Sequence, residues 1–177
     1  GMLLVYLSLP VPQFTEFDAH YFPSADLRIA RLSEPKNYAV RTEPAGSTVL
    51  CAELPAGPDD PWWTMDDAAL AALVLDDLRR AGIPAPVEPT AVHVRRLPQA
   101  YPIYLNGYER WFEVLDRWAG SQPRLLSYGR QGLFAHDNTH HALAMAYAAA
   151  ECLDAGGFND ARWAEHRREF EGHVVED

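Results

Sequence analysis

Prolines divide the first 45 residues into short pieces, and their spacing restricts the fold more than any other feature of the sequence. A proline lacks the N–H group that a strand ladder needs, so it marks an edge or a turn. Strand signals fill the gaps between the prolines. The prolines are Pro10, Pro12, Pro23, Pro35 and Pro44, and the expected strands are Met2–Leu9, Asp18–Phe22 with a following Leu27–Leu32, and Ser47–Leu54.

The stretch Ser47–Leu54 has the alternation of a strand that packs on at least one face. Thr48, Leu50 and Ala52 fall on one side, and the residues between them fall on the other. The opening run Met2–Leu7 is apolar, has no basic segment before it and is too short to cross a bilayer. It predicts a buried strand, so a meander or a mixed sheet is expected.

Helical periodicity follows this region. Thr64 is the expected N-cap of a first helix, through the amide of Asp67, and Gly82 and Pro84 end that helix. The expected helix Thr139–Leu153 is apolar nearly all round, which predicts burial against more than one neighbour. The remaining expected elements are a strand Thr90–Leu97, a helix opening at Asn106–Glu109 with an aromatic stripe, a short strand Arg124–Tyr128, a loop Gly129–Asn138, and a helix Asn159–Phe170.

Together these elements predict an α+β fold. We expect a mixed, largely antiparallel sheet with helices packed on one face, plus a C-terminal strand-loop-helix extension. The chain has 177 residues, of which 48% are hydrophobic, enough for a packed core and for one domain or one domain with an appendage.

Charge and cysteine content narrow the function classes. The formal net charge is −10, which disfavours nucleic acid as a partner. Cys51 and Cys152 lie far apart in dissimilar surroundings, so neither a disulfide scaffold nor a thiolate zinc site is indicated. A reducing, cytoplasmic compartment is expected, with no membrane span.

The stretch Tyr128–His141 is the richest in chemistry. It runs from a strand end through a turn containing Gly129 and Gly132 to a helix N-terminus, where free N–H groups and the helix dipole attract an anion. Arg130 adds a planar fork suited to phosphate or carboxylate. A strand-to-helix loop with two glycines is also a common plain turn, and the residues alone leave both interpretations open.

Histidines in the same stretch raise the question of a metal ion. His136 and His140 are spaced as i and i+4, and Asp137 and His141 lie beside them. His136 precedes the helix, however, and Asp137 or Asn138 is the expected N-cap. Spacing fixes no third acidic ligand, so the sequence predicts no metal site. Spacing assigns no catalytic acid, base or nucleophile either.

A second cluster combines arginines with aromatic residues. Arg95 and Arg96 precede Tyr101, Tyr104 and Tyr108. Such a group can form a wall for a planar or sugar-nucleotide ligand, although aromatic residues near a helix start also fill cores.

Several segments, in order and spacing, resemble the C-terminal half of a flavin-dependent oxidoreductase. The most specific are Ser33–Tyr38, Pro98–Tyr104 and Gly129–Gly132, supported by His20–Pro23 and the opening strand. The group is the FAD-linked amine-oxidase and protoporphyrinogen-oxidase-like superfamily, particularly bacterial members similar to UDP-galactopyranose mutase. The resemblance covers about residues 2 to 155.

The resemblance implies two regions and FAD as the family cofactor. Residues 2–120 would form the substrate-domain-like region, and residues 121–177 the returning strand, flavin-facing loop and helices. The implied substrate-binding residues are Arg95, Tyr101 and Tyr104, and the implied cofactor-binding residues are Gly129, Arg130, Gly132, Asp137, Asn138 and Thr139.

One part of the family pattern is missing. No Gly-x-Gly-x-x-Gly follows any expected strand, and no acidic ribose ligand follows at the usual distance. The expectation is therefore a truncated, partial enzyme that lacks the dinucleotide-binding half and is not catalytic alone. Two alternatives stay open: a stand-alone ligand-binding module, and a sugar-nucleotide mutase fragment that would use Arg31, Arg95 and Arg96.

The missing half has a structural consequence. The segment Leu125–Tyr128 and the helix Ala142–Leu153 would lose the sheet against which they pack. We expect one of two partners to cover this helix. One is a second copy of the chain, in a homodimer that buries the helix and in one version exchanges the C-terminal segment. The other is a separate nucleotide-binding half.

Overall fold

The computed structural model describes residues 1–38 and 43–175. The chain divides into two compact units, residues 1–101 and residues 102–177, and each is described by itself. The boundary expected near residue 120 divides the chain by implied function, not by how the chain packs, and it stays a prediction.

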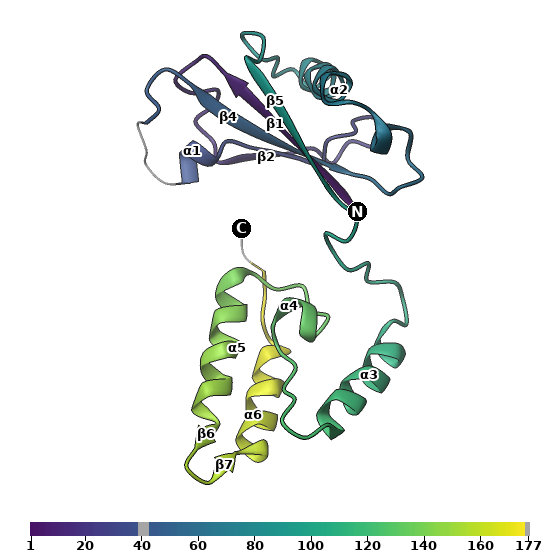
Figure 1. Ribbon diagram of the computed structural model, residues 1–177, viewed down its shortest axis with the longest axis vertical. Coiled ribbons are helices and arrows are strands. Elements are labelled where there is room, and N and C mark those ends of the chain that lie inside the picture. The colour runs from purple at the N-terminus through teal and green to yellow at the C-terminus, as the bar shows by residue number, and fades with distance from the viewer. Residues whose placement is uncertain (39–42, 176–177) are drawn as a thin grey trace. The chain divides into compact units, whose positions relative to one another are not determined.

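The first unit is built on a five-stranded sheet in the order β2-β3-β4-β1-β5 (Figure 1). Every strand pair in it is antiparallel. The expected α+β fold class is confirmed, and each of the five prolines lies outside the strands. The strands are β1 (Met2–Leu9), β2 (Ala19–Tyr21), β3 (Arg31–Ser33), β4 (Thr48–Pro55) and β5 (Ala91–Leu97).

One face of this sheet forms the core of the unit. Alternate residues of β1 and β4 are buried there, and helix α2 (Asp67–Arg80) covers them (Figure 1). Burying each leucine side chain contributes about 1.5–3 kcal/mol. The fully buried members include Leu3, Leu7, Leu50, Leu54, Leu70 and Leu78.

The expected start of α2 at Thr64 is wrong. Thr64 ends a 3-10 turn, Pro61–Thr64, and Asp66 is the N-cap. The carboxylate of Asp66 accepts a hydrogen bond from the Ala69 N–H at 2.7 Å. Pro61 supports its own short turn in front of the helix, so the cap falls two residues later than the hydroxyl spacing indicated.

The segment Ser33–Tyr38 contains a buried carboxylate. Glu34 follows β3 and accepts hydrogen bonds from the main-chain N–H groups of Phe14 and Thr15 and from the Thr48 hydroxyl. Lys36, in the short helix α1 (Pro35–Tyr38), donates to three main-chain oxygens from flanking loops. This segment, one of the most specific parts of the resemblance, therefore organises the surrounding loops.

The second unit is mainly helical, and α5 and α6 lie side by side in it (Figure 1). Its buried cluster is formed by Ala148, Ala149, Cys152 and Trp163. The elements are α3 (Glu109–Ser121), α4 (Gly129–Gly132), α5 (Thr139–Glu151), α6 (Asp160–Phe170) and a small hairpin of β6 (Leu153–Asp154) and β7 (Gly157–Phe158).

Two expectations fail in this unit. Residues 125–128 do not form the expected strand: Pro123 and Arg124 make a turn, with Arg124 at φ 61°, and no neighbouring strand of the described chain pairs with the segment. Helix α5 is buried on one side only, through Met145, Ala148 and Ala149, whereas Leu143 is 57% exposed and Tyr147 is 73% exposed. The described chain does not supply the cover that the apolar composition of α5 predicts.

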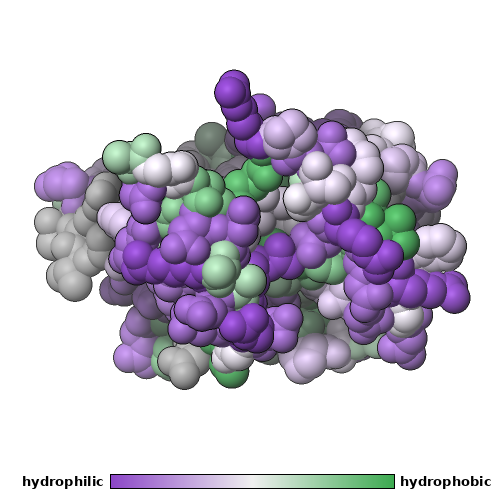
Figure 2. All heavy atoms as spheres, turned by 90° about the horizontal axis from the view of Figure 1, so that it is seen from below, coloured by the Kyte–Doolittle hydropathy of each residue, from purple (hydrophilic) through white to green (hydrophobic). Residues whose placement is uncertain are grey.

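Other exposed apolar side chains lie on α3, none of whose residues is buried. On the face drawn in Figure 2, hydrophobic residues form separate areas among hydrophilic ones. Within residues 1–38 and 43–175, no helix has both the length and the apolar character needed to cross a bilayer.

Candidate functional site

A cavity of about 530 Å³ lies where the α4 loop meets the start of α5. Four of the residues implied as cofactor-binding line it: Arg130, Asp137, Asn138 and Thr139. His140 and Ala142 complete the lining. Gly129 and Gly132, the other two, lie in α4 and shape the loop without lining the cavity.

Each of the two glycines meets a different local requirement of the backbone. Gly129 adopts φ 81°, a left-handed conformation that favours glycine, and its N–H contacts the sulfur of buried Met145 at 3.1 Å. At Gly132 a Cβ would lie 2.9 Å from the Ser127 hydroxyl oxygen. That hydroxyl donates to the Gly132 carbonyl at 2.9 Å, so Ser127 acts in folding this turn.

The N-terminus of α5 gives the cavity its donors. Asn138 and His141 form a reciprocal capping box, in which the Asn138 N–H donates to His141 Nδ1 at 3.2 Å. The box uses the N–H groups of Asn138 and His141, which leaves those of Thr139 and His140 as the other donors of the first turn. The helix dipole adds partial positive charge at the same point.

Arg130 joins the loop to this helix start. Its Nη1 donates to the main-chain oxygen of Asp137 at 3.0 Å. A guanidinium group and a helix N-terminus therefore border one small cavity, which suits an anionic or electron-rich ligand edge. The glycine-containing turn and the helix start lie together as the sequence indicates, whereas the strand expected before them is not found in the described residues, and anion binding stays a prediction.

Aromatic rings gather beside the loop. Tyr104 lies with its ring centroid 5.1 Å from that of Phe134 and 6.3 Å from that of His136. Tyr108 contacts the same phenylalanine at 5.1 Å. Burial raises the pKa of Tyr104, although Arg130 acts in the opposite direction. Tyr104 thus belongs to the second unit together with the loop.

The other two predicted substrate residues belong to the first unit. Arg95 is exposed on β5, and Tyr101 is 52% exposed at the end of that unit. On the same sheet face as Arg95, the rings of Tyr6 and His93 lie 6.2 Å apart, on neighbouring strands. The structure therefore groups Tyr104 with the cofactor-type loop and places Arg95 and Tyr101 in a separate unit.

Two arginines considered for a sugar nucleotide already have structural partners. Arg31 forms an ion pair with Glu53 across β3 and β4. Arg96 donates to the main-chain oxygens of Trp63 and Met65, in front of α2. These contacts hold both guanidinium groups against the first unit.

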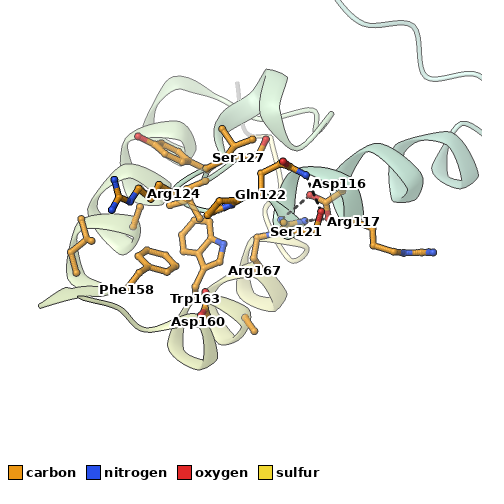
Figure 3. A pocket seen from close by; sticks show the side chains of 18 of the residues that line it. Asp116, Arg117, Ser121, Gln122, Arg124, Ser127, Phe158, Asp160, Trp163 and Arg167 are labelled. Carbon is orange, nitrogen blue, oxygen red and sulfur yellow. Dashed lines mark hydrogen bonds and ion pairs between the residues drawn. The ribbon is translucent and has the colours of Figure 1, made fainter. Parts of the chain in front are cut away.

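A larger cavity, about 1230 Å³, lies in the second unit and was not foreseen (Figure 3). Trp163 and Phe158 lie on its wall, and Arg167 of α6 forms a two-point ion pair with Asp116 of α3 at 2.9 and 3.1 Å. Because these two residues are 51 positions apart, the sequence spacing could not predict their ion pair. The lining combines apolar residues, among them Leu125, Leu126 and the α5 alanines, with charged residues of α3 and α6.

The fold of this chain is similar to a part of two larger proteins of known structure. The crystal structure of reduced UDP-galactopyranose mutase matches 99% of this chain and 38% of its own, with a TM-score of 0.73 and 16% identity. A putative protoporphyrinogen oxidase from Exiguobacterium sp. 255-15 matches 66% of this chain and 26% of its own, with a TM-score of 0.52 and 20% identity.

The predicted resemblance is confirmed at the level of fold, which is what identities of this size establish. The chain spans less than half the length of either structure. No family model matches the sequence. No curated protein matches it.

Proposed function

We propose that this chain supplies the substrate-side sheet and the flavin-facing loop of an FAD-dependent oxidoreductase. The observation that carries the proposal is the cavity at the start of α5, where Arg130 and the first-turn N–H groups meet. Reduced flavin accumulates negative charge on one edge of its ring, and a helix N-terminus stabilises such charge. The residues present fit that edge.

The flavin, when bound, supplies the redox chemistry, and the chain's own residues orient it. The N–H groups of Thr139 and His140 would donate to the electron-rich edge, with Arg130 beside them. The ring of Tyr104 would limit access of water from the aromatic side.

The same proposal assigns the adenine half of FAD to residues outside this chain. The described sheet is antiparallel, whereas a dinucleotide site requires a parallel strand, a glycine-rich turn and a helix. The partial coverage of the two similar structures supports a chain that is one portion of such an enzyme. Alone, it would bind the flavin ring weakly and would not turn over substrate.

A mutase-type function has one supporting observation, the likeness to UDP-galactopyranose mutase. A sugar-nucleotide pyrophosphate needs several uncommitted cations. Of the three arginines considered, Arg31 and Arg96 are held by structural contacts, which leaves Arg95 as the exposed one. We therefore rank the oxidoreductase role above it.

Flavin fluorescence tests the proposal. The purified chain is titrated against FMN, FAD and ADP. FMN and FAD should bind with similar, weak affinity, and ADP should not compete, because the site recognises the ring. Thr139→Pro is the informative variant: proline is favoured at the first helical position, yet it removes one N–H donor.

Thr139→Pro should weaken FMN binding by roughly tenfold, the effect of about 1.4 kcal/mol of lost interaction. Arg117→Gln, which alters the lining of the larger cavity, is the matched control and should bind as the parent does. No binding of FMN at millimolar concentration, or equal binding by Thr139→Pro, would remove the basis of the proposal.

A further inference from the structure

Three ionisable side chains from separate parts of the second unit converge beside the start of α5. Asp137 ends the loop, His141 lies in the first turn of α5, and His173 follows α6. One ligand-type atom from each lies within 4.8 Å of the others. Asp137 and His141 are buried, and the two histidine rings stack with their centroids 4.3 Å apart.

The buried Asp137 carboxylate has too few hydrogen-bond donors to replace the water that it loses on burial. Its side chain is 3% exposed, and Oδ2 has no hydrogen-bond partner in the described chain. His173 Nδ1 is likewise buried without a hydrogen bond there. A buried carboxylate is expensive unless a cation or several donors face it.

The state of His141 makes this arrangement more unusual. Its Nδ1 accepts the Asn138 N–H, so this nitrogen presents a lone pair rather than a proton. The same Nδ1 lies 3.3 Å from Asp137 Oδ1, which is also an acceptor. Two acceptors at this distance repel unless a positive species lies between them or beside them.

Two of the three ligand-atom distances fit a metal ion, and one of the stacked rings of His141 and His173 has to turn for both in-plane nitrogen lone pairs to meet at it. Ligand atoms about 2.05 Å from a tetrahedral Zn²⁺ lie about 3.3 Å from one another. Asp137 Oδ1 is 3.3 Å from His141 Nδ1 and 3.5 Å from His173 Nδ1. Two imidazoles and a carboxylate are also the ligand types that zinc prefers when one position stays open.

We propose that Asp137, His141 and His173 bind one divalent transition-metal ion, with Zn²⁺ as the best fit. The ion would tie the segment after α6 to the first turn of α5. Asp137 also lines the small cavity, so the metal would lie at the wall of that cavity. The proposal does not depend on flavin binding.

Besides this loss of ring stacking, two features oppose the ion and set its affinity. Arg130 brings positive charge to the main-chain oxygen of Asp137. His141 Nδ1 must also give up its bond to the Asn138 N–H, which sacrifices half of the capping box. Both effects weaken binding relative to a dedicated site, so a moderate affinity is expected.

Metal titration of the tagless, chelator-treated chain tests the site. Co²⁺ serves as a visible probe, because tetrahedral coordination gives intense absorption bands, and Zn²⁺ is followed by calorimetry. We expect one equivalent of each to bind, with Zn²⁺ displacing Co²⁺, and Zn²⁺ to raise the thermal midpoint.

The key variant is His173→Phe, which keeps the ring stack on His141 and removes the ligand nitrogen. It should weaken Zn²⁺ binding by roughly tenfold or more and abolish the thermal shift, with an unchanged circular dichroism spectrum. Asp137→Asn should act in the same direction. His93→Gln removes an exposed histidine of the first unit and is the control. Absence of stoichiometric binding, or full binding by folded His173→Phe, overturns the proposal.

Discussion

Glu34 shows at the residue scale how a motif can be structural. Its carboxylate is 1% exposed and accepts from two loop N–H groups and the Thr48 hydroxyl. Glu34→Gln replaces one acceptor oxygen with a donor, which leaves buried N–H groups unsatisfied. We expect a loss of about 1.5–3 kcal/mol in the free energy of unfolding, measured by urea denaturation. The exposed Glu88→Gln is the control, and an equal effect of the two would contradict this role.

Cys51 carries a pH prediction. Burial raises the pKa of its thiol above the ordinary value. Its contribution to stability is therefore complete below the unfolded-state pKa of about 8.5, and it is lost as the pH rises toward the folded-state pKa. In urea unfolding, the difference in the free energy of unfolding between the parent chain and Cys51→Ala should become smaller from pH 7.5 to pH 9.5. A gap that widens over this interval would show that the thiolate is favoured in the fold.

At the scale of elements, the start of α2 tests how a helix selects its cap. Asp66→Ala removes the acceptor for the Ala69 N–H and should destabilise the chain by about 1 kcal/mol. Thr64→Ala, at the position that spacing favoured, should change stability by less than about 0.5 kcal/mol. Both are measured by thermal and urea unfolding of the whole chain. The reverse order of effects would restore Thr64 as the cap.

The elements also show which features the sequence could predict. Strand alternation and prolines are local signals, and they located β1, β4 and β5 closely. The segment Arg124–Tyr128 has strand-like composition, but a strand requires a neighbour, and sequence patterns do not reveal that no strand within residues 1–38 and 43–175 pairs with it. The residues around the small cavity could be grouped from the sequence because they are nearly contiguous, and their role in cofactor binding stays a prediction. The position of His173 could not be predicted from the sequence, because only the packing of α6 beside α5 brings this residue close to Asp137.

On the scale of the whole molecule, the exposed apolar residues of α5 require explanation. Leu143 and Tyr147 are one turn apart, so they share one exposed face. The wall of the larger cavity includes other residues of the same helix. Large exposed apolar side chains that share one helix face favour contact with a partner. In the proposed enzyme the nucleotide-binding half would cover it, and in its absence a second copy of the chain is the available partner.

Association through α5 is therefore predicted for the isolated chain. Light scattering coupled to gel filtration should give twice the 19.8 kDa of one chain. Leu143→Lys and Tyr147→Lys, which keep good helix propensity, should shift the mass to that of a monomer because burying the ammonium group in the contact is unfavourable. Val87→Lys places the same charge at an exposed apolar position of the first unit and should leave the dimer intact. A monomeric parent chain at high concentration would show that this helix face tolerates water.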